Sequence, residues 1–136
     1  MTDTFPITIY HNPKCGTSRN TLAMIEAAGY APDIVEYSKV GWTRAQLEQI
    51  LSAMDGTARE IMRTRGTPAE ELGLTDPTAS DEAILSAMLQ HPVLVNRPIV
   101  VTPLGTKLCR PSEVVLGLLE KQPEGFTKED GEVVIR

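Results

Sequence analysis

Near its start the chain reads Ile7-Thr-Ile-Tyr-His-Asn-Pro-Lys-Cys-Gly-Thr-Ser-Arg-Asn-Thr-Leu22, a segment that predicts a strand, a turn and a helix in direct succession. The β-branched run is typical of a buried strand, and Asn12-Pro13 ends it. An amphipathic pattern begins after Gly16, so we expect Cys15 at the point where the strand turns into a helix. The first N–H groups of a helix lack internal partners and favour an anion or a thiolate. Cys15 is therefore a candidate nucleophile.

The residues around Cys15 supply further positive charge. His11 lies four residues before it, and Lys14 and Arg19 are close in sequence. The alternative for Cys15 is a buried structural cysteine, because free cysteine is among the most buried residue types. The alternative for His11 is a turn histidine bonded to the backbone. The polar, turn-like sequence favours the reactive thiol.

Composition limits the class of protein and its partners. The 136 residues fit one domain, and the net charge of −5 argues against a general nucleic-acid binder. Eight of the thirteen basic residues are arginine, which suits a small oxyanion ligand. The two cysteines, Cys15 and Cys109, form no disulfide framework and no zinc-binding spacing, and Cys109 is expected to serve packing. With no signal peptide and no long apolar run, we expect a cytoplasmic protein that does not enter a membrane.

The pattern along the chain predicts an α/β fold with the order βαβ, a helical insertion, then ββα. Strands are expected at residues 7–10 and 33–37, joined by a helix that ends at Gly29. Residues 43–91 carry three capping signals and a Met and Leu stripe that we assign to a core, so we expect an all-helical subdomain inserted in a single domain that spans residues 1–136. Strand character returns at residues 93–95 and 99–102, interrupted by Asn96-Arg97-Pro98. A short antiparallel strand is expected at 107–109, a helix at 112–120, and a lightly packed tail from Gln122 onward.

This order, with a cysteine after the first strand and a proline before a later one, is the plan of the thioredoxin-like fold with a mixed four-stranded sheet. The chain also resembles the glutaredoxin-coupled arsenate reductases over residues 7 to 132. The resemblance rests on four segments: His11 to Leu22, Glu70 to Leu74, Gln90 to Leu116 and, with small differences, Phe126 to Glu132. Residues 31 to 45 and the extreme termini depart most from the family.

The resemblance implies a role for six residues. The nucleophile of the family falls on Cys15, and the histidine held to favour its thiolate falls on His11. Three oxyanion-binding arginines and a cis proline fall on Arg63, Arg97, Arg110 and Pro98. Guanidinium groups beside a helix N-terminus would offset the repulsion between a thiolate and arsenate, which is a dianion at neutral pH.

Sequence spacing alone does not single out these arginines. Arg63 has Arg59 and Arg65 as neighbours, and such a run is usually a solvated face; only the resemblance selects Arg63. Arg97 and Arg110 each precede a proline, which favours an extended backbone at both positions.

The resemblance implies an arsenate reductase. Cys15 would form an adduct with arsenate, glutathione would act as co-substrate, glutaredoxin would resolve the mixed disulfide, and arsenite would leave. No metal and no bound organic cofactor is expected, and we expect a monomer. Two alternatives stay open: a regulator resembling the Spx proteins, which use a Cys-x-x-Cys switch where this chain has Ser18, and a fold relative with another thiol substrate.

Overall fold

The computed structural model describes residues 5–135. The chain forms two compact units, each described here by itself. The sheet unit comprises the chain up to Glu36 and the chain from Arg97 onward, and the helical unit comprises Tyr37–Asn96. Whether the two together behave as a single domain stays a prediction.

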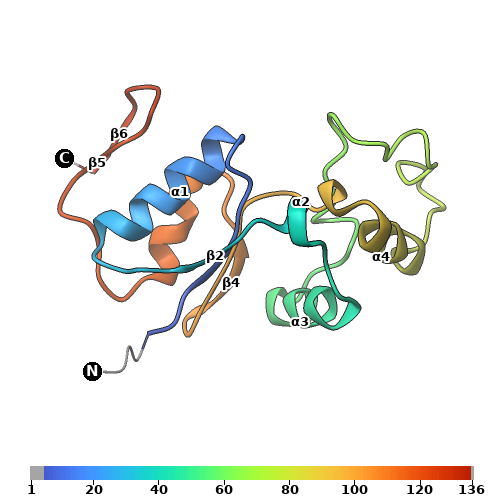
Figure 1. Ribbon diagram of the computed structural model, residues 1–136, viewed down its shortest axis with the longest axis horizontal. Coiled ribbons are helices and arrows are strands. Elements are labelled where there is room, and N and C mark those ends of the chain that lie inside the picture. The colour runs from blue at the N-terminus through green and yellow to red at the C-terminus, as the bar shows by residue number, and fades with distance from the viewer. Residues whose placement is uncertain (1–4, 136) are drawn as a thin grey trace. The chain divides into compact units, whose positions relative to one another are not determined.

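The sheet unit contains a four-stranded mixed sheet with the order β2-β1-β3-β4 (Figure 1). β1 pairs in parallel with β2 and antiparallel with β3, and β3 pairs antiparallel with β4. The predicted four-stranded mixed sheet is therefore confirmed. The strands are β1 (Thr8–Tyr10), β2 (Asp33–Val35), β3 (Ile99–Thr102) and β4 (Gly105–Leu108).

Two helical elements of the sheet unit pack against each other. They are α1 (Gly16–Ala27) and the 3-10 helix η2 (Ser112–Leu118), and η2 also contacts β3 and β4. The two helices and the two central strands supply most of the fully buried side chains of the core, among them Ile9, Met24, Ile25, Val100 and Val115, and Cys109 after β4 adds another. The predicted helix at 112–120 is thus present, but as a shorter 3-10 helix.

The helical unit contains α2 (Tyr37–Val40), α3 (Arg44–Met54), α4 (Asp81–Gln90) and the 3-10 helix η1 (Pro92–Leu94). α3 begins with the predicted capping box, in which Thr43 and Gln46 exchange side-chain and backbone hydrogen bonds. The predicted strand at 93–95 is wrong, because Pro92 starts a 3-10 turn and only Val95 forms an isolated bridge, to Met62. Tyr37 was predicted to end β2; it instead begins α2 and donates its hydroxyl to the Val95 carbonyl at 2.8 Å.

The prediction that residues 43–91 are all helical is wrong for the segment between α3 and α4. Residues 57–79 form turns. The capping pair Thr57 and Glu60 does form, at 2.8 and 3.3 Å, but no long helix follows it. Gly66 and Gly73 adopt positive φ angles of 75° and 74°, which a right-handed helix does not accept.

The chain after Gln122 is not the lightly packed tail that the sequence predicted. It forms an antiparallel hairpin of β5 (Phe126–Thr127) and β6 (Val133–Ile135). Phe126 and Val134 pack against the core of the sheet unit, and Glu129 pairs with Arg19 of α1 at 2.9 Å. Contacts distant in sequence therefore hold this segment.

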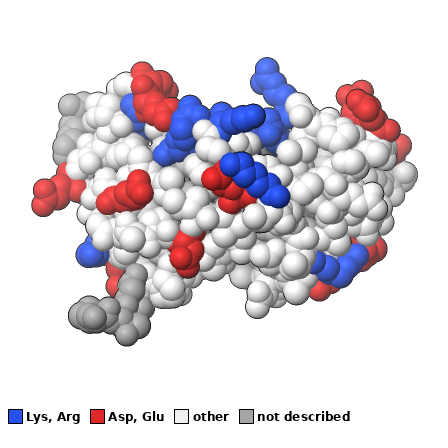
Figure 2. Space-filling view, in the orientation of Figure 1, with Lys and Arg blue, Asp and Glu red and all other residues white. Residues whose placement is uncertain are grey.

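The surface carries charge in small groups. On the face shown in Figure 2, basic and acidic side chains both occur, with uncharged surface between the groups. Within residues 5–135, no helix combines the length and the apolar character needed to cross a membrane.

Thr102 provides a test of how η2 is held on the sheet. Its buried hydroxyl donates to the Leu118 carbonyl at 2.7 Å and accepts from the Leu104 N–H at 3.1 Å. Thr102→Val keeps the shape but removes both bonds, so we expect the free energy of unfolding to fall by about 1–3 kcal/mol. Urea denaturation measures this change. Thr127→Val in β5, where the side chain is exposed, is the control and should change little; equal losses in the two variants would contradict the assignment.

Candidate active site around Cys15

Cys15 occupies the N-cap position of α1, as predicted. Its backbone is extended, with φ −99° and ψ 122°, and its carbonyl accepts the N–H of Arg19 at 2.9 Å. The turn before it closes through the Cys15 N–H and the Asn12 carbonyl, 3.0 Å apart. The residue is 7% exposed. The thiol is therefore held at the start of the helix with little access to water.

Competing effects set the protonation of the Cys15 thiol. Burial raises its pKa, whereas the backbone N–H of Ser18 and the Arg110 guanidinium, 3.6 Å from the sulfur, lower it. The positive charges of Arg97 and Arg110 lower it further. The net pKa lies below the ordinary value, so the thiolate is favoured.

The sheet topology explains why these arginines lie near Cys15. Tyr10 at the end of β1 faces Ile99 at the beginning of β3, so the residues after β1 and before β3 meet at one edge. β4 runs back to the same edge, where the Cys109 N–H donates to the Pro98 carbonyl at 2.9 Å. Arg110 then donates to the carbonyl of Arg97 at 3.0 Å, and both arginines precede a cis peptide bond to proline.

His11 is buried and contacts Ser18 in the first turn of α1. It is 5% exposed, and its Nδ1 lies 2.6 Å from the Ser18 hydroxyl, which also accepts the Asn12 N–H at 3.1 Å. Burial lowers the pKa of His11 and outweighs the nearby Glu36, which raises it. The lowered pKa favours the neutral imidazole, and the role of His11 toward the thiolate stays a prediction.

Ser18 contacts both Cys15 and His11, whereas the sequence singled it out only as the residue in place of a second cysteine. Its N–H lowers the pKa of Cys15, and its hydroxyl joins His11 to the turn at Asn12. Ser18 is the third residue of α1, and the N–H groups of the first turn lack partners within the helix. This position could have indicated from the sequence that the Ser18 N–H is free to bond Cys15.

The arginines of the helical unit differ from one another. The Arg59 guanidinium donates to three carbonyls of the turn segment, those of Leu74, Asp76 and Ala79, at 2.7–3.3 Å. Arg59 therefore has a structural role. Arg63 donates Nε to the Arg65 carbonyl at 3.0 Å, and its own N–H bonds the Leu94 carbonyl at 2.7 Å. Its predicted role toward an oxyanion stays a prediction, because it belongs to the other unit.

Cys109 is a packing residue, as predicted. It is fully buried in the core of the sheet unit, and its thiol approaches the Lys107 carbonyl at 3.7 Å. Burial raises the pKa of this thiol to about 12. Cys109 is therefore protonated and unreactive at neutral pH.

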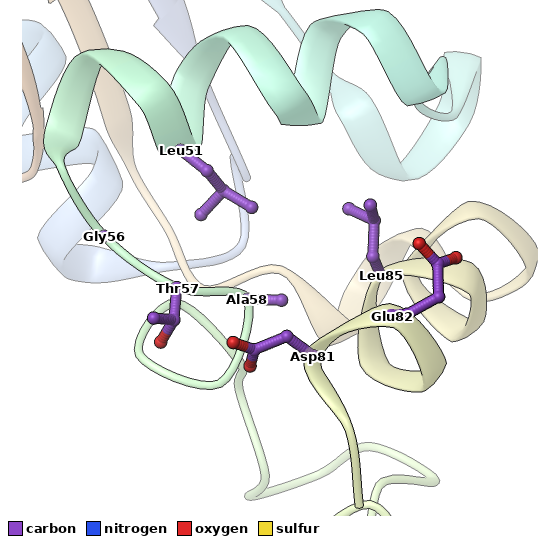
Figure 3. A pocket seen from close by; sticks show the side chains of 7 residues that line it. All are labelled: Leu51, Gly56, Thr57, Ala58, Asp81, Glu82 and Leu85. Carbon is purple, nitrogen blue, oxygen red and sulfur yellow. The ribbon is translucent and has the colours of Figure 1, made fainter.

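A separate open pocket of about 200 Å³ lies within the helical unit (Figure 3). Leu51 of α3 and Leu85 of α4 point toward each other across it, and Asp81 turns its carboxylate toward the loop at Ala58. Asp81 also accepts the backbone N–H of Arg59 at 3.4 Å. None of the described residues that line it is basic, so this pocket does not suit an oxyanion.

Within residues 5–135, no group of three or more His, Cys, Asp and Glu side chains forms a candidate metal site.

The lowered pKa of Cys15 predicts a specific pH dependence of alkylation. The rate with iodoacetamide should follow the thiolate, with an inflection below about 8.5, the value of a free thiol. Arg110→Gln removes both a hydrogen bond and a charge that lower the pKa, so the inflection should move up. Arg65→Gln, at an exposed position, is the control. An inflection at or above the free-thiol value in the unmodified protein would contradict the arrangement described above.

Comparison with known proteins agrees with this site. The ArsC family model matches residues 10–118. The arsenate reductase of Rhizobium meliloti is 60% identical over 130 residues, which cover 95% of this chain and 93% of that protein. The arsenate reductase of Escherichia coli strain K12 is 53% identical, with 95% and 92% covered. Among solved structures, the arsenate reductase from Vibrio cholerae superposes with a TM-score of 0.80 at 37% identity, over 86% of this chain and all of that one.

The match covers Cys15, both arginines of the sheet unit and the whole helical unit. The site thus joins a cysteine at a helix N-terminus to two arginines at the adjoining sheet edge. The chain that carries it belongs to the ArsC family.

Proposed function

We propose that this protein reduces arsenate to arsenite, with Cys15 as the nucleophile. The observation that carries the proposal is the Cys15 sulfur itself, held at the N-terminus of α1 with the Arg110 guanidinium 3.6 Å away. The arsenate reductase relatives, more than half identical over almost the whole chain, support the same substrate.

In the first step the thiolate of Cys15 attacks arsenic. An S–As bond forms, and one arsenate oxygen takes up protons and leaves as water, while arsenic stays in the +5 state. The thiolate and the oxyanion repel each other, so positive charge is needed where they meet. Arg97 and Arg110 lie at the sheet edge next to Cys15 and can supply this positive charge. A guanidinium can also bind two oxygens at once.

In the second step a glutathione thiolate attacks the Cys15 sulfur. A disulfide bond forms between glutathione and Cys15, the S–As bond breaks, and its electron pair stays on arsenic, which leaves as arsenite in the +3 state. Glutaredoxin then removes glutathione by thiol–disulfide exchange and restores the thiol. Electrons and atoms balance with two external thiols, and no bound cofactor takes part.

An external thiol is needed because the chain has no suitable second cysteine. Cys109 is buried with its pKa raised to about 12, and Ser18 stands where a Cys-x-x-Cys pair would have its second sulfur. The same serine weighs against the alternative of an Spx-like regulator that switches through a local disulfide. For Arg63 we propose a contribution to oxyanion binding, on the family resemblance alone.

Replacing each cysteine tests the glutathione route. Cys15→Ser should abolish arsenate reduction, because a serine hydroxyl is not ionised at neutral pH. Cys109→Ala should keep most of the activity, because the buried thiol takes no part. A coupled assay with arsenate, glutathione, glutaredoxin and NADPH measures both. Equal loss in two folded variants would favour a Cys15–Cys109 disulfide cycle and rule out the glutathione route.

Replacing the arginines by lysine tests the oxyanion site. Lysine keeps the charge but loses the fork, so Arg97→Lys and Arg110→Lys should each lower kcat/KM about ten- to a hundred-fold, for a loss of roughly 1.5–3 kcal/mol. A fall in kcat beside the rise in KM would show that the lost contacts are stronger in the transition state. Arg63→Lys tests the third proposed arginine, and the exposed Arg65→Lys is the control. Unchanged kinetics in Arg97→Lys and Arg110→Lys would mean that neither guanidinium binds the substrate.

A further inference from the structure

The C-terminal hairpin contacts the segment that carries Cys15 through one pair of side chains. Arg19 and Glu129 form a bidentate ion pair, with Nε to Oε2 at 2.9 Å and Nη2 to Oε1 at 3.0 Å. The remaining nitrogen of Arg19, Nη1, donates to the carbonyl of Pro13 at 2.8 Å. Pro13 lies in the turn just before Cys15. One guanidinium therefore links the hairpin to the backbone of the turn that presents the nucleophile.

Further contacts place the Glu129 carboxylate at the start of α1. The N–H of Glu129 donates to the Asn20 side chain at 3.0 Å. A Cβ atom on Gly16 would lie 4.0 Å from the Glu129 carboxylate, so the carboxylate is next to the residue that follows Cys15. The adjacent Lys128 pairs with Glu113 of η2 at 2.9 Å. The hairpin thus joins α1, which follows Cys15, to η2, which follows Arg110 (Figure 1).

We propose that Glu129 is a positioning residue for the reaction of Cys15. It orients Arg19, and Arg19 fixes the Pro13 carbonyl and hence the turn that aims the sulfur. The inference rests on arsenate reduction as the proposed function. Both side chains are about half exposed, at 43% and 50%, so the pair adds little to stability. The bidentate geometry of the pair instead restricts the orientation of Arg19 and of the turn that it holds. The rate of attack by a nucleophile depends on its orientation.

A direct electrostatic role of Glu129 would have the opposite sign. A carboxylate near the helix N-terminus repels both the thiolate and an arriving oxyanion. If charge alone mattered, Glu129→Gln would lower the pKa of Cys15 and lower KM. If positioning dominates, the same variant releases Arg19 and the turn, so kcat falls although a repulsive charge has been removed.

The test compares Glu129→Gln, Arg19→Gln and the double variant. Each single variant should lower kcat about three- to ten-fold, because a displaced nucleophile reacts more slowly, with KM changed less. In the double variant the second substitution should have no further effect, because Glu129 acts through Arg19. Glu132→Gln is the matched control: the same substitution in the same hairpin, at a residue paired with Lys128 rather than with Arg19. The midpoints of thermal unfolding of these variants should agree with that of Glu132→Gln within experimental error.

Alkylation of Cys15 by iodoacetamide gives a readout that needs neither arsenate nor glutathione. The limiting rate at high pH, where the thiol is fully ionised, should fall in Glu129→Gln, and Glu129→Asp should restore part of it. Loss of arsenate turnover in the unmodified protein, with the alkylation differences intact, would reject the proposed function and not the positioning role. Unchanged kcat and alkylation in Glu129→Gln, or additive losses in the double variant, would overturn the inference.

Discussion

The antiparallel pairing of β1 with β3 is the constraint on which the site depends. Cys15 follows β1 and Arg97 precedes β3, so this one register places the nucleophile and a guanidinium at the same sheet edge. The β3–β4 hairpin then returns the chain and adds Arg110. Residues that are more than eighty positions apart are thereby brought together.

The site resolves an electrostatic conflict. A buried thiol resists ionisation, and a thiolate resists the approach of an oxyanion. The N-terminus of α1 and the two arginines act against both effects, and they do so from three segments because no single segment carries enough positive charge. Burial lowers the pKa of His11, which favours its neutral form, and its ring contacts the Ser18 hydroxyl.

Local signals in the sequence were sufficient for the parallel pairing of the first two strands, the antiparallel hairpin of β3 and β4 and the place of Cys15. The strand, the turn at Asn12 and the start of α1 are each determined by adjacent residues. The errors occur where distant contacts decide. The capping pair at Thr57 formed but no helix followed, and the hairpin after Gln122 is held by Glu129 and Arg19, which are 110 residues apart. Nor could spacing separate Arg59, which binds three carbonyls, from Arg63.

The helical unit lies in the chain between β2 and β3, and this order has a consequence for biosynthesis. A ribosome makes Cys15 long before Arg97 and Arg110, and at roughly 5–20 residues per second the delay is on the order of 5–20 seconds. Until then the β1–β3 pairing that gathers the arginines cannot form. The nascent cysteine therefore lacks the charges that lower its pKa, and it resembles an ordinary thiol. The contribution of Arg97 and Arg110 to the thiolate therefore arises only once β1 and β3 have paired.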